Sequence, residues 1–382
     1  IELSTSLSFD DDEIETTWFG GGASRSIDDL QVGGLSFLYP IPTYRGSLVF
    51  GISIDRIQNY NLAYERAGRD PDLSFFGSLD DDIAPPGEVR DRHDREGKLN
   101  LVSGAVGWDV SPRLSLGVAL SVLYGSIFDE QTFTTTDTDG IDPDLASSEV
   151  YYLLDSDVTG VSGLLGVTYK ASPSFRFGGV LGLPRAVELE RFEQFRIVDR
   201  FDDGSESLEL ETTIPPNEEI TYPWWFGFGV AFGAKGLLVA GDIRYSDWRE
   251  MKDKVAGTEF FLRPYYKETA SVSLGAEYLF PSIPLRVRAG YRYEPVPFNL
   301  TYVPLAGELV LTDGRDPAEV DVELDGERDF FSLGAGYLFG AVMTVDLAGE
   351  PGGFDRAHLF EPDLYNEKRT SSRLIGTASY RF

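Results

Sequence analysis

Six charged residues are the side chains of this sequence best suited, by type and spacing, to bind a ligand. They occur where charged and apolar residues alternate, and they are Asp242, Arg244, Glu277, Arg286, Arg288 and Arg292. Two or three guanidinium groups that face one cavity can hold a carboxylate by paired hydrogen bonds. The alternative is a network in which these Arg residues pair with Asp and Glu residues across strands and simply fill a wide interior. The sequence leaves both interpretations open, and we favour the second for any single residue.

Catalytic chemistry has little support in the sequence. The two histidines, His93 and His358, both fall in segments expected to form outer loops, and His93 lies among alternating Arg and Asp residues that are typical of an exposed polar loop. Neither a Gly-x-Ser-x-Gly nor a His-Glu-x-x-His motif occurs, and there is no cysteine. We therefore expect a protein that is not an enzyme and that uses no metal and no cofactor.

Composition narrows the class of protein. The 382 residues carry a net charge of −30, which argues against nucleic acid as a partner because phosphate binding requires clustered Lys and Arg. Mean hydropathy is −0.16, and no stretch approaches the roughly 18–20 consecutive apolar residues of a membrane helix. The sequence therefore excludes a helical membrane protein and leaves room for two soluble domains or one large barrel.

The segments that must position the six charges alternate with a period of two, which indicates β-strands. In 285–293, apolar side chains share one face, and Arg286, Arg288 and Arg292 share the other. Several apolar faces end in Tyr or Phe, as expected for an aromatic girdle at a membrane surface. We expect strands near residues 1–10, 30–41, 46–65, 97–110, 114–135, 158–171, 175–197, 219–233, 237–249, 268–280, 285–297, 328–339, 341–350 and 367–382.

The links between these strands alternate between short and long, which predicts an up-and-down meander. Four long links, 67–96, 129–157, 186–220 and 298–327, hold most of the negative charge and fall on the same side. In outer-membrane barrels, short turns face the periplasm and long loops face outside. We therefore expect the acidic loops to be extracellular and both termini to be periplasmic. Such charge blocks are usually solvated; bridging to lipopolysaccharide through divalent cations is the alternative.

The last segment favours a membrane barrel. Residues 373–382 alternate and stop at Phe382, like the C-terminal signal by which outer-membrane barrels are recognised for insertion; the alternative is a soluble sheet protein that ends in Phe. Strands in lipid must satisfy their backbone groups in a closed ladder. The predicted fold is all-β: a membrane-spanning, up-and-down antiparallel β-barrel of about 14 strands, formed as one domain by residues 1–382.

Residues 175–298 also carry a family resemblance. The stretches in question are LGLPRAVELE (181–190), TTIPPNEEITYPWWFGFGVAF (212–232), GDIRYSDWRE (241–250) and KETASVSLGAEYLFPSIPLRVRAGYRYEPVPF (267–298). Their succession resembles the FadL family of outer-membrane transporters for long-chain fatty acids, with its toluene-channel relatives.

The resemblance implies a monomeric barrel in the outer membrane, through which hydrophobic small molecules such as long-chain fatty acids pass without energy coupling. It also implies an N-terminal hatch that plugs the lumen and a kinked strand that releases ligand sideways. Ile1 already begins the first expected strand, so no hatch is expected here, and the chain is either truncated or gated differently. Two other functions stay open: a FadL-like barrel that serves as a secretion or surface-anchoring partner, and a general porin.

Overall fold

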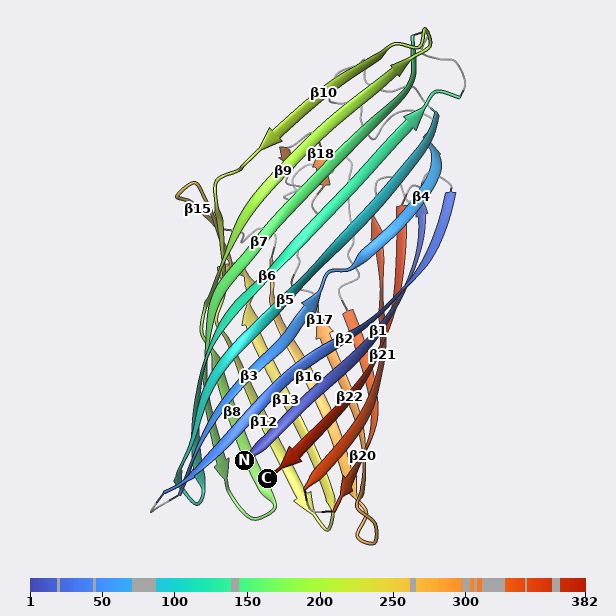
Figure 1. Cartoon of the computed structure of the whole chain (residues 1–382). Coiled ribbons are helices and arrows are strands. Elements are labelled where there is room, and N and C mark those ends of the chain that lie inside the picture. Colours follow the sequence, from blue (N-terminus) through green and yellow to red (C-terminus); the bar gives the residue numbers. More distant parts are fainter. Residues whose placement is uncertain are drawn as a thin grey trace.

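The structure is a computed structural model, and it describes residues 1–18, 21–43, 46–70, 87–138, 144–261, 266–295, 297, 303–305, 308–310, 327–340, 342–358 and 365–382. The strands close into a barrel, and part of the wall continues beyond it at one end (Figure 1). No helix among the described residues is long and apolar enough to cross a membrane.

The barrel is closed and has 14 antiparallel strands, which confirms the predicted fold class. It closes where the first strand pairs with the last, with Glu2 opposite Arg381 and Trp18 opposite Tyr365. In chain order the barrel strands are β1 (Glu2–Trp18), β2 (Gly21–Pro42), β3 (Ser47–Asn59), β5 (Gly87–Ser111), β6 (Leu114–Thr136), β7 (Leu145–Lys170), β8 (Phe175–Gly182), β12 (Trp225–Ala234), β13 (Leu237–Asp247), β16 (Glu268–Leu279), β17 (Leu285–Pro295), β20 (Glu327–Phe339), β21 (Met343–His358) and β22 (Tyr365–Arg381).

The remaining elements lie toward the end of the barrel away from the termini. They are β4 (Leu62–Asp70), β9 (Arg185–Phe201), β10 (Glu206–Thr213), β11 (Glu218–Tyr222), the single-turn helix η1 (Trp248–Glu250), β14 (Lys252–Val255), β15 (Thr258–Phe261), β18 (Val303–Leu305) and β19 (Glu308–Val310).

Alternation places apolar side chains on the outside of the barrel and small or polar ones inside. In β12, Phe226, Phe228 and Phe232 are exposed on the outer surface, whereas Gly227 and Gly229 face the lumen. An exposed apolar wall of this kind is expected against lipid. At the short-turn end, three pairs of aromatic rings contact each other with centroid distances of 5.1, 4.7 and 4.7 Å; they are Tyr278–Phe280, Tyr337–Phe339 and Tyr380–Phe382. These pairs correspond to an aromatic girdle at that end.

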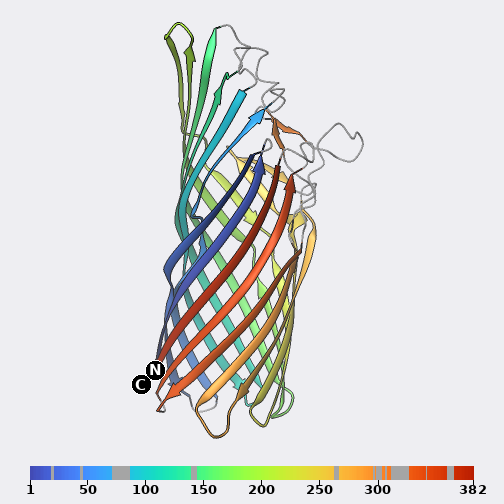
Figure 2. The same ribbon diagram turned by 90° about the vertical axis from the view of Figure 1, so that its right-hand side faces the viewer.

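Tight turns join the strands at the end of the barrel where both termini lie (Figure 2). Between β12 and β13, Lys235 and Gly236 have φ angles of 50° and 84°. A type I′ hairpin requires such left-handed values at both central positions. The short links predicted from the sequence therefore fall at one end, together with the two termini.

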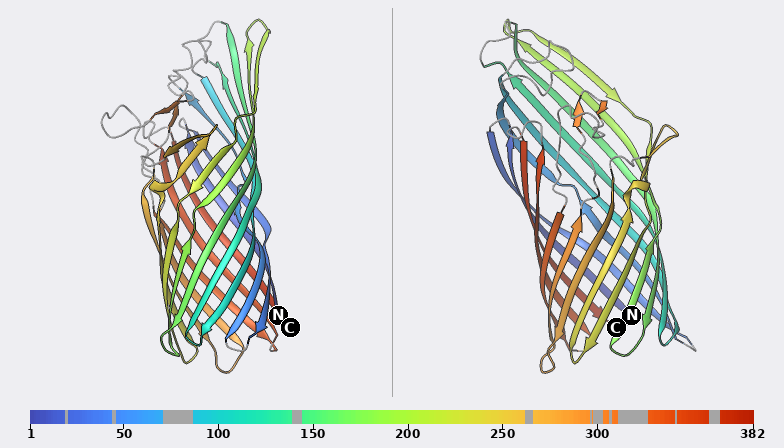
Figure 3. Two further views of the ribbon diagram at one scale, coloured as in Figure 1. Left: turned by 90° about the vertical axis from the view of Figure 1, so that its left-hand side faces the viewer. Right: turned by 180° about the vertical axis from the view of Figure 1, so that it is seen from behind.

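At the opposite end, part of the barrel wall continues as a single sheet, here called the upper sheet (Figure 3). It consists of residues 62–70, 87–96, 127–136, 145–157, 190–201 and 206–213. The prediction that 67–96, 129–157 and 186–220 are loops is therefore wrong for residues 67–70, 87–96, 129–136, 145–157, 186–201 and 206–213, whereas 71–86 lie outside the described residues. The charges are compatible with strands because they pair across the sheet, as Arg66 and Asp91 do at 2.8 Å.

Two further corrections concern strand lengths. β1 continues to Trp18, beyond the strand predicted at 1–10, and β2 already begins at Gly21, before the strand predicted at 30–41. The fourth acidic link, 298–327, lies mostly outside the described residues, although the short hairpin of β18 and β19 falls within it.

The strands predicted at 175–197 and 219–233 are each interrupted at a proline. Pro184 separates β8 from β9, and Pro223 separates β11 from β12. Proline has no N–H to donate to a ladder, which explains why regular pairing stops there. The two interruptions lie side by side, because the last residue of β8 pairs with the first residue of β12.

Candidate functional site

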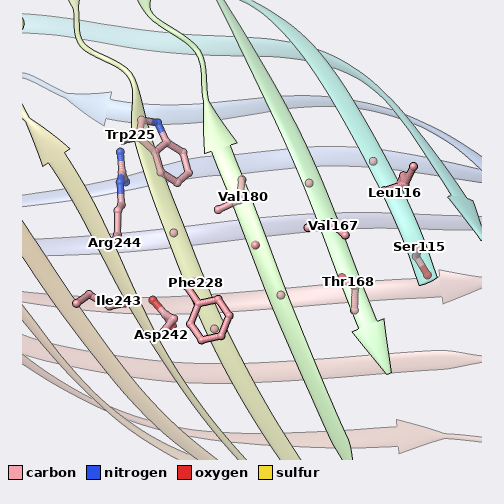
Figure 4. Close-up of a pocket in the computed structure, with 16 residues that line it drawn as sticks. Ser115, Leu116, Val167, Thr168, Val180, Trp225, Phe228, Asp242, Ile243 and Arg244 are labelled. Atoms are coloured by element: carbon pink, nitrogen blue, oxygen red, sulfur yellow. The ribbon is translucent and has the colours of Figure 1, made fainter. Parts of the chain in front are cut away.

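Five lumen-facing glycines form a hollow in the inner wall of the barrel, on β6, β7, β8 and β12. They are Gly117, Gly166, Gly178, Gly227 and Gly229. Strand pairing brings them together, with Gly117 opposite Gly166 and Gly178 opposite Gly229. Because no side chain projects from these positions, the wall recedes and leaves a space of about 560 Å³, here called the glycine hollow (Figure 4).

Trp225 and two of the predicted ligand-binding residues, Asp242 and Arg244, border the glycine hollow (Figure 4). The guanidinium carbon of Arg244 lies 3.9 Å from the centroid of the Trp225 ring, which is a cation–π contact. Trp225 packs over Gly182, where a Cβ atom would collide with the indole. Within the described part of the chain, neither Asp242 nor Arg244 forms a hydrogen bond or an ion pair. Both side chains therefore have polar atoms available to a ligand.

Three of the other predicted residues form an ion-pair network on β16, β17 and β21. Arg286 donates from Nε and Nη2 to the two carboxylate oxygens of Asp346, at 3.0 and 2.7 Å. Arg288 donates from Nε to Glu277 at 2.6 Å and from Nη1 to Asp346 at 3.0 Å. Asp346 is not among the residues predicted from the sequence, although the alternation of β21 places it on the lumen side.

Arg292 is also engaged. Its Nη2 donates to Glu350 at 3.2 Å, and its guanidinium carbon lies 4.4 Å from the centroid of the Phe330 ring. The structure thus does not bring the six candidate residues together. Four of them have partners within the lumen, whereas Asp242 and Arg244, beside the hollow, form no hydrogen bond or ion pair with the residues that the structure describes.

Above the glycine hollow, the inner wall carries a group of buried apolar side chains. Leu99, Leu123, Val158, Val187 and Leu189 form a buried cluster with exposed fractions between 1% and 9%, here called the lumenal apolar cluster. Leu123 is an even number of residues from Gly117 along β6, so both residues lie on the lumen face. A lumen wall of buried aliphatic side chains differs from the polar interior of a porin.

The lumen-side face of the upper sheet carries the rings of Phe133, Tyr152 and Phe195 among polar and charged side chains such as Asp91 and Glu193. Tyr152 lies directly opposite Phe195, and all three side chains are half-buried. Burial raises the pKa of the Tyr152 phenol, and the nearby carboxylate of Glu193 acts in the same direction. The phenol therefore stays neutral, and the three rings present a largely uncharged surface.

The sequence predicted His93 in an exposed loop, and this is wrong, because His93 lies in β5. Its Nε2 is 2.5 Å from Asp129, its Nδ1 is 3.2 Å from the Tyr64 hydroxyl, and Arg95 donates to Asp129 from Nε at 2.6 Å. Burial raises the pKa of Asp129, but hydrogen bonds and charge from His93 and Arg95 outweigh burial, so the pKa lies below its ordinary value. These residues tie β4, β5 and β6 together. The other histidine, His358, ends β21, and its side chain lies outside the described residues.

Comparison with solved structures defines the class: a closed barrel of the FadL type. The toluene transporter TodX of Pseudomonas putida matches with a TM-score of 0.61 and 15% identity, over 100% of this chain and 90% of that chain. A FadL homologue of Pseudomonas aeruginosa matches with a TM-score of 0.58 and 15% identity, over 99% of this chain and 90% of that chain. At this level of identity the similarity shows a shared fold, and it confirms the FadL-like architecture expected from the sequence.

A family model places the chain more narrowly. The model described as BamG matches residues 80–300. The match covers more than half of the chain, and the chain belongs to the BamG family. No curated protein matches the sequence.

Proposed function

We propose that the protein is a channel, and not an enzyme, for the passive uptake of hydrophobic small molecules across the outer membrane. The observation that carries the proposal is the lumenal apolar cluster, which sets aliphatic side chains on the lumen face of β5, β6, β7 and β9. A general porin conducts through a polar, water-filled lumen, so this lining favours hydrophobic ligands over polar ones. Each methylene that a ligand removes from water contributes about 0.8 kcal/mol, and passage needs no energy source.

The apolar side chains mark a route for such a ligand. It begins at Phe133, Tyr152 and Phe195 on the upper sheet, passes the lumenal apolar cluster, and ends in the glycine hollow. Val180 and the Trp225 ring offer apolar contact there, and the five glycines leave room for the ligand. The paired charges of β16, β17 and β21 have no role in this route and fill the lumen.

Long-chain fatty acids are the ligands that this hollow suits best. The free guanidinium of Arg244 can hold a carboxylate, while the alkyl chain lies against Trp225. Asp242, two residues away on the same face, carries the opposite charge and opposes anion binding. TodX is described as a toluene transporter and a monoaromatic hydrocarbon channel, which supports the wider class of hydrophobic compounds.

The proposal includes a setting for the barrel. Residues 1–382 form one monomeric barrel domain whose apolar outer wall contacts outer-membrane lipids. The short turns and both termini face the periplasm, and the acidic upper sheet faces outside, where lipopolysaccharide is the neighbouring lipid. This arrangement follows from the link lengths and the charge pattern of the sequence.

Ligand binding tests the proposal directly. A fluorescent long-chain fatty acid is titrated against the detergent-purified wild-type barrel and against Gly166→Leu. The nearest atom to a Cβ at Gly166 is the Gly179 carbonyl oxygen at 4.0 Å, so the wall accepts the substitution and the Leu side chain extends into the hollow. Saturable binding by the wild type and its loss in Gly166→Leu are expected.

Gly104→Leu is the matched control. Gly104 lies opposite Leu120, which is 68% exposed on the outer surface, and no atom lies within 4 Å of a Cβ there. The same side chain is thus added to the outer wall and should leave binding unchanged. Equal binding by both variants, or no saturable binding by a folded wild-type barrel, contradicts the proposal.

A further inference from the structure

β10 forms the free edge of the upper sheet (Figure 1). Among the described residues it pairs only with β9. β11 continues the same course toward the barrel but is paired on both sides, with β9 and with β14. All residues of β10 are exposed. Within the described part of the chain, one edge, roughly 26 Å long at about 3.3 Å per residue, is therefore unpaired.

The hydrogen-bond pattern shows which backbone groups face this open edge. The N–H of Phe201 donates to the Ser205 carbonyl oxygen at 2.9 Å at the start of the β9–β10 hairpin. Hydrogen-bonded and non-hydrogen-bonded pairs alternate along an antiparallel ladder. It follows that Leu208, Leu210 and Thr212 direct their N–H and C=O groups away from β9 and offer them to another strand.

The side chains of β10 differ between its two faces. Leu208 and Leu210 are 67% and 55% exposed on one face. Glu209 and Glu211 project from the other face, which they share with Glu193 of β9. Within the described part of the chain, none of these three carboxylates has a hydrogen bond or ion pair. The edge thus combines apolar side chains with uncompensated negative charge.

Charge decides which kind of strand can add to this edge. A second copy that paired antiparallel about Leu210 would set Glu209 opposite Glu211 of the other copy, and like charges directly opposite each other are destabilising. The neighbouring Arg196 and Arg200 are already in ion pairs with other acids of the upper sheet. The complementary strand is therefore basic and belongs to another protein.

We propose that β10 is a docking edge for an extended segment of a partner protein in which Lys or Arg alternates with apolar residues. The segment adds to the sheet by backbone hydrogen bonds to Leu208 and Leu210, as in other cases of strand addition. Its basic residues lie opposite Glu209 and Glu211, and its apolar residues lie opposite the two leucines. The proposal is independent of transport and gives the barrel an anchoring role at its outer end.

A synthetic peptide tests this edge. The probe is the acetylated and amidated sequence Lys-Val-Lys-Val-Lys-Val-Lys, labelled with a fluorophore and titrated against the full-length detergent-purified protein by anisotropy. Saturable binding is expected. Leu210→Pro should weaken it about tenfold, because one hydrogen-bond donor facing the open edge is lost. Proline is tolerated at such an edge position because the removed N–H makes no bond to β9.

Three controls separate strand addition from other causes. Leu210→Ala keeps the N–H and should bind more tightly than Leu210→Pro. A peptide N-methylated at its central Val leaves the protein unchanged and should lose binding by a similar factor, which keeps the test valid if Leu210→Pro does not fold. A peptide with Glu in place of Lys should not bind, because it meets Glu209 and Glu211 with like charge.

The other outcomes overturn the proposal. Binding that survives both Leu210→Pro and N-methylation is electrostatic attraction without backbone hydrogen bonds to β10. Wild-type dimers that dissociate in Leu210→Pro, seen by analytical ultracentrifugation, identify a second copy as the occupant. No saturable binding of the Lys-Val peptide means that the edge does not accept a basic strand.

Discussion

Arg286 and Asp346 form an ion pair across a strand, and Gly336 lies between them. Gly336 is opposite Arg286 on one side and opposite Asp346 on the other. The Nη2–Oδ2 distance is 2.7 Å, and a Cβ at Gly336 would collide with both side chains. The lumenal charge network therefore depends on one position that has no side chain.

Gly336→Ala should destabilise the barrel. The new methyl group separates Arg286 from Asp346 and leaves two partly buried charges without their best partner, at a cost of about 1–3 kcal/mol. The measurement is the temperature at which the barrel loses its heat-modifiable mobility on a gel. Gly349→Ala is the matched control, because no atom lies within 4 Å of a Cβ at Gly349. Equal unfolding temperatures for the two variants would show that the pair does not need this space.

Arg244→Gln should weaken the binding of a fatty acid about tenfold or more, because a charge-assisted hydrogen bond to the carboxylate is lost. The corresponding long-chain alcohol should bind wild type and variant equally, since it carries no negative charge. Titration of both ligands measures the difference. Lys235→Gln removes one positive charge from a short turn and serves as the control. A loss of affinity that is the same for acid and alcohol would contradict a carboxylate contact at Arg244.

Asp242→Asn should have the opposite effect on fatty-acid binding and raise the affinity. Asp242 lies on the same face as Arg244 and has no partner among the residues that the structure describes. Without the negative charge of Asp242, the site no longer repels an anion. The fatty acid should therefore bind more tightly, and the binding of the alcohol should not change. Weaker binding of the acid would place its carboxylate away from this part of the wall.

The upper sheet should loosen in acid through Asp129. Its folded pKa lies below the ordinary value, since hydrogen bonds and charge from His93 and Arg95 outweigh the effect of burial. A depressed carboxyl pKa stabilises the folded state above the unfolded pKa of about 3.9, and this contribution is lost as the pH falls through the folded pKa. The protection factors of the amide hydrogens in β5 and β6, which correct for the intrinsic slowing of exchange in acid, should fall below about pH 4 in the wild type.

Asp129→Asn provides the comparison for this acid effect. The variant lacks the titrating carboxylate, so the protection factors in 87–96 and 127–136 should already be lower at neutral pH and should change less on acidification. If the wild type and Asp129→Asn show the same acid response, other carboxylates control the stability of the upper sheet.

The sequence by itself determined the barrel and its strand order. Period-two alternation, short links at regular intervals and aromatic residues at the ends of strands are local properties. They recur from strand to strand because the outer face of each strand of a membrane barrel meets lipid. The pattern also placed Arg286, Arg288 and Arg292 on one face, where the structure has them. Local alternation cannot tell a charged loop from a charged strand, however. For this reason the upper sheet, with His93 in β5, was predicted as loops.

Only the tertiary structure decided which charges are free and where the wall is hollow. Arg286 finds Asp346 two strands away and 60 residues along the chain, a distance over which alternation carries no information. The glycine hollow likewise exists because glycines of separate strands come into register, as Gly117 does with Gly166 and Gly178 with Gly229. Ion pairing and cavity formation depend on distances between strands, and the closure of the barrel sets those distances.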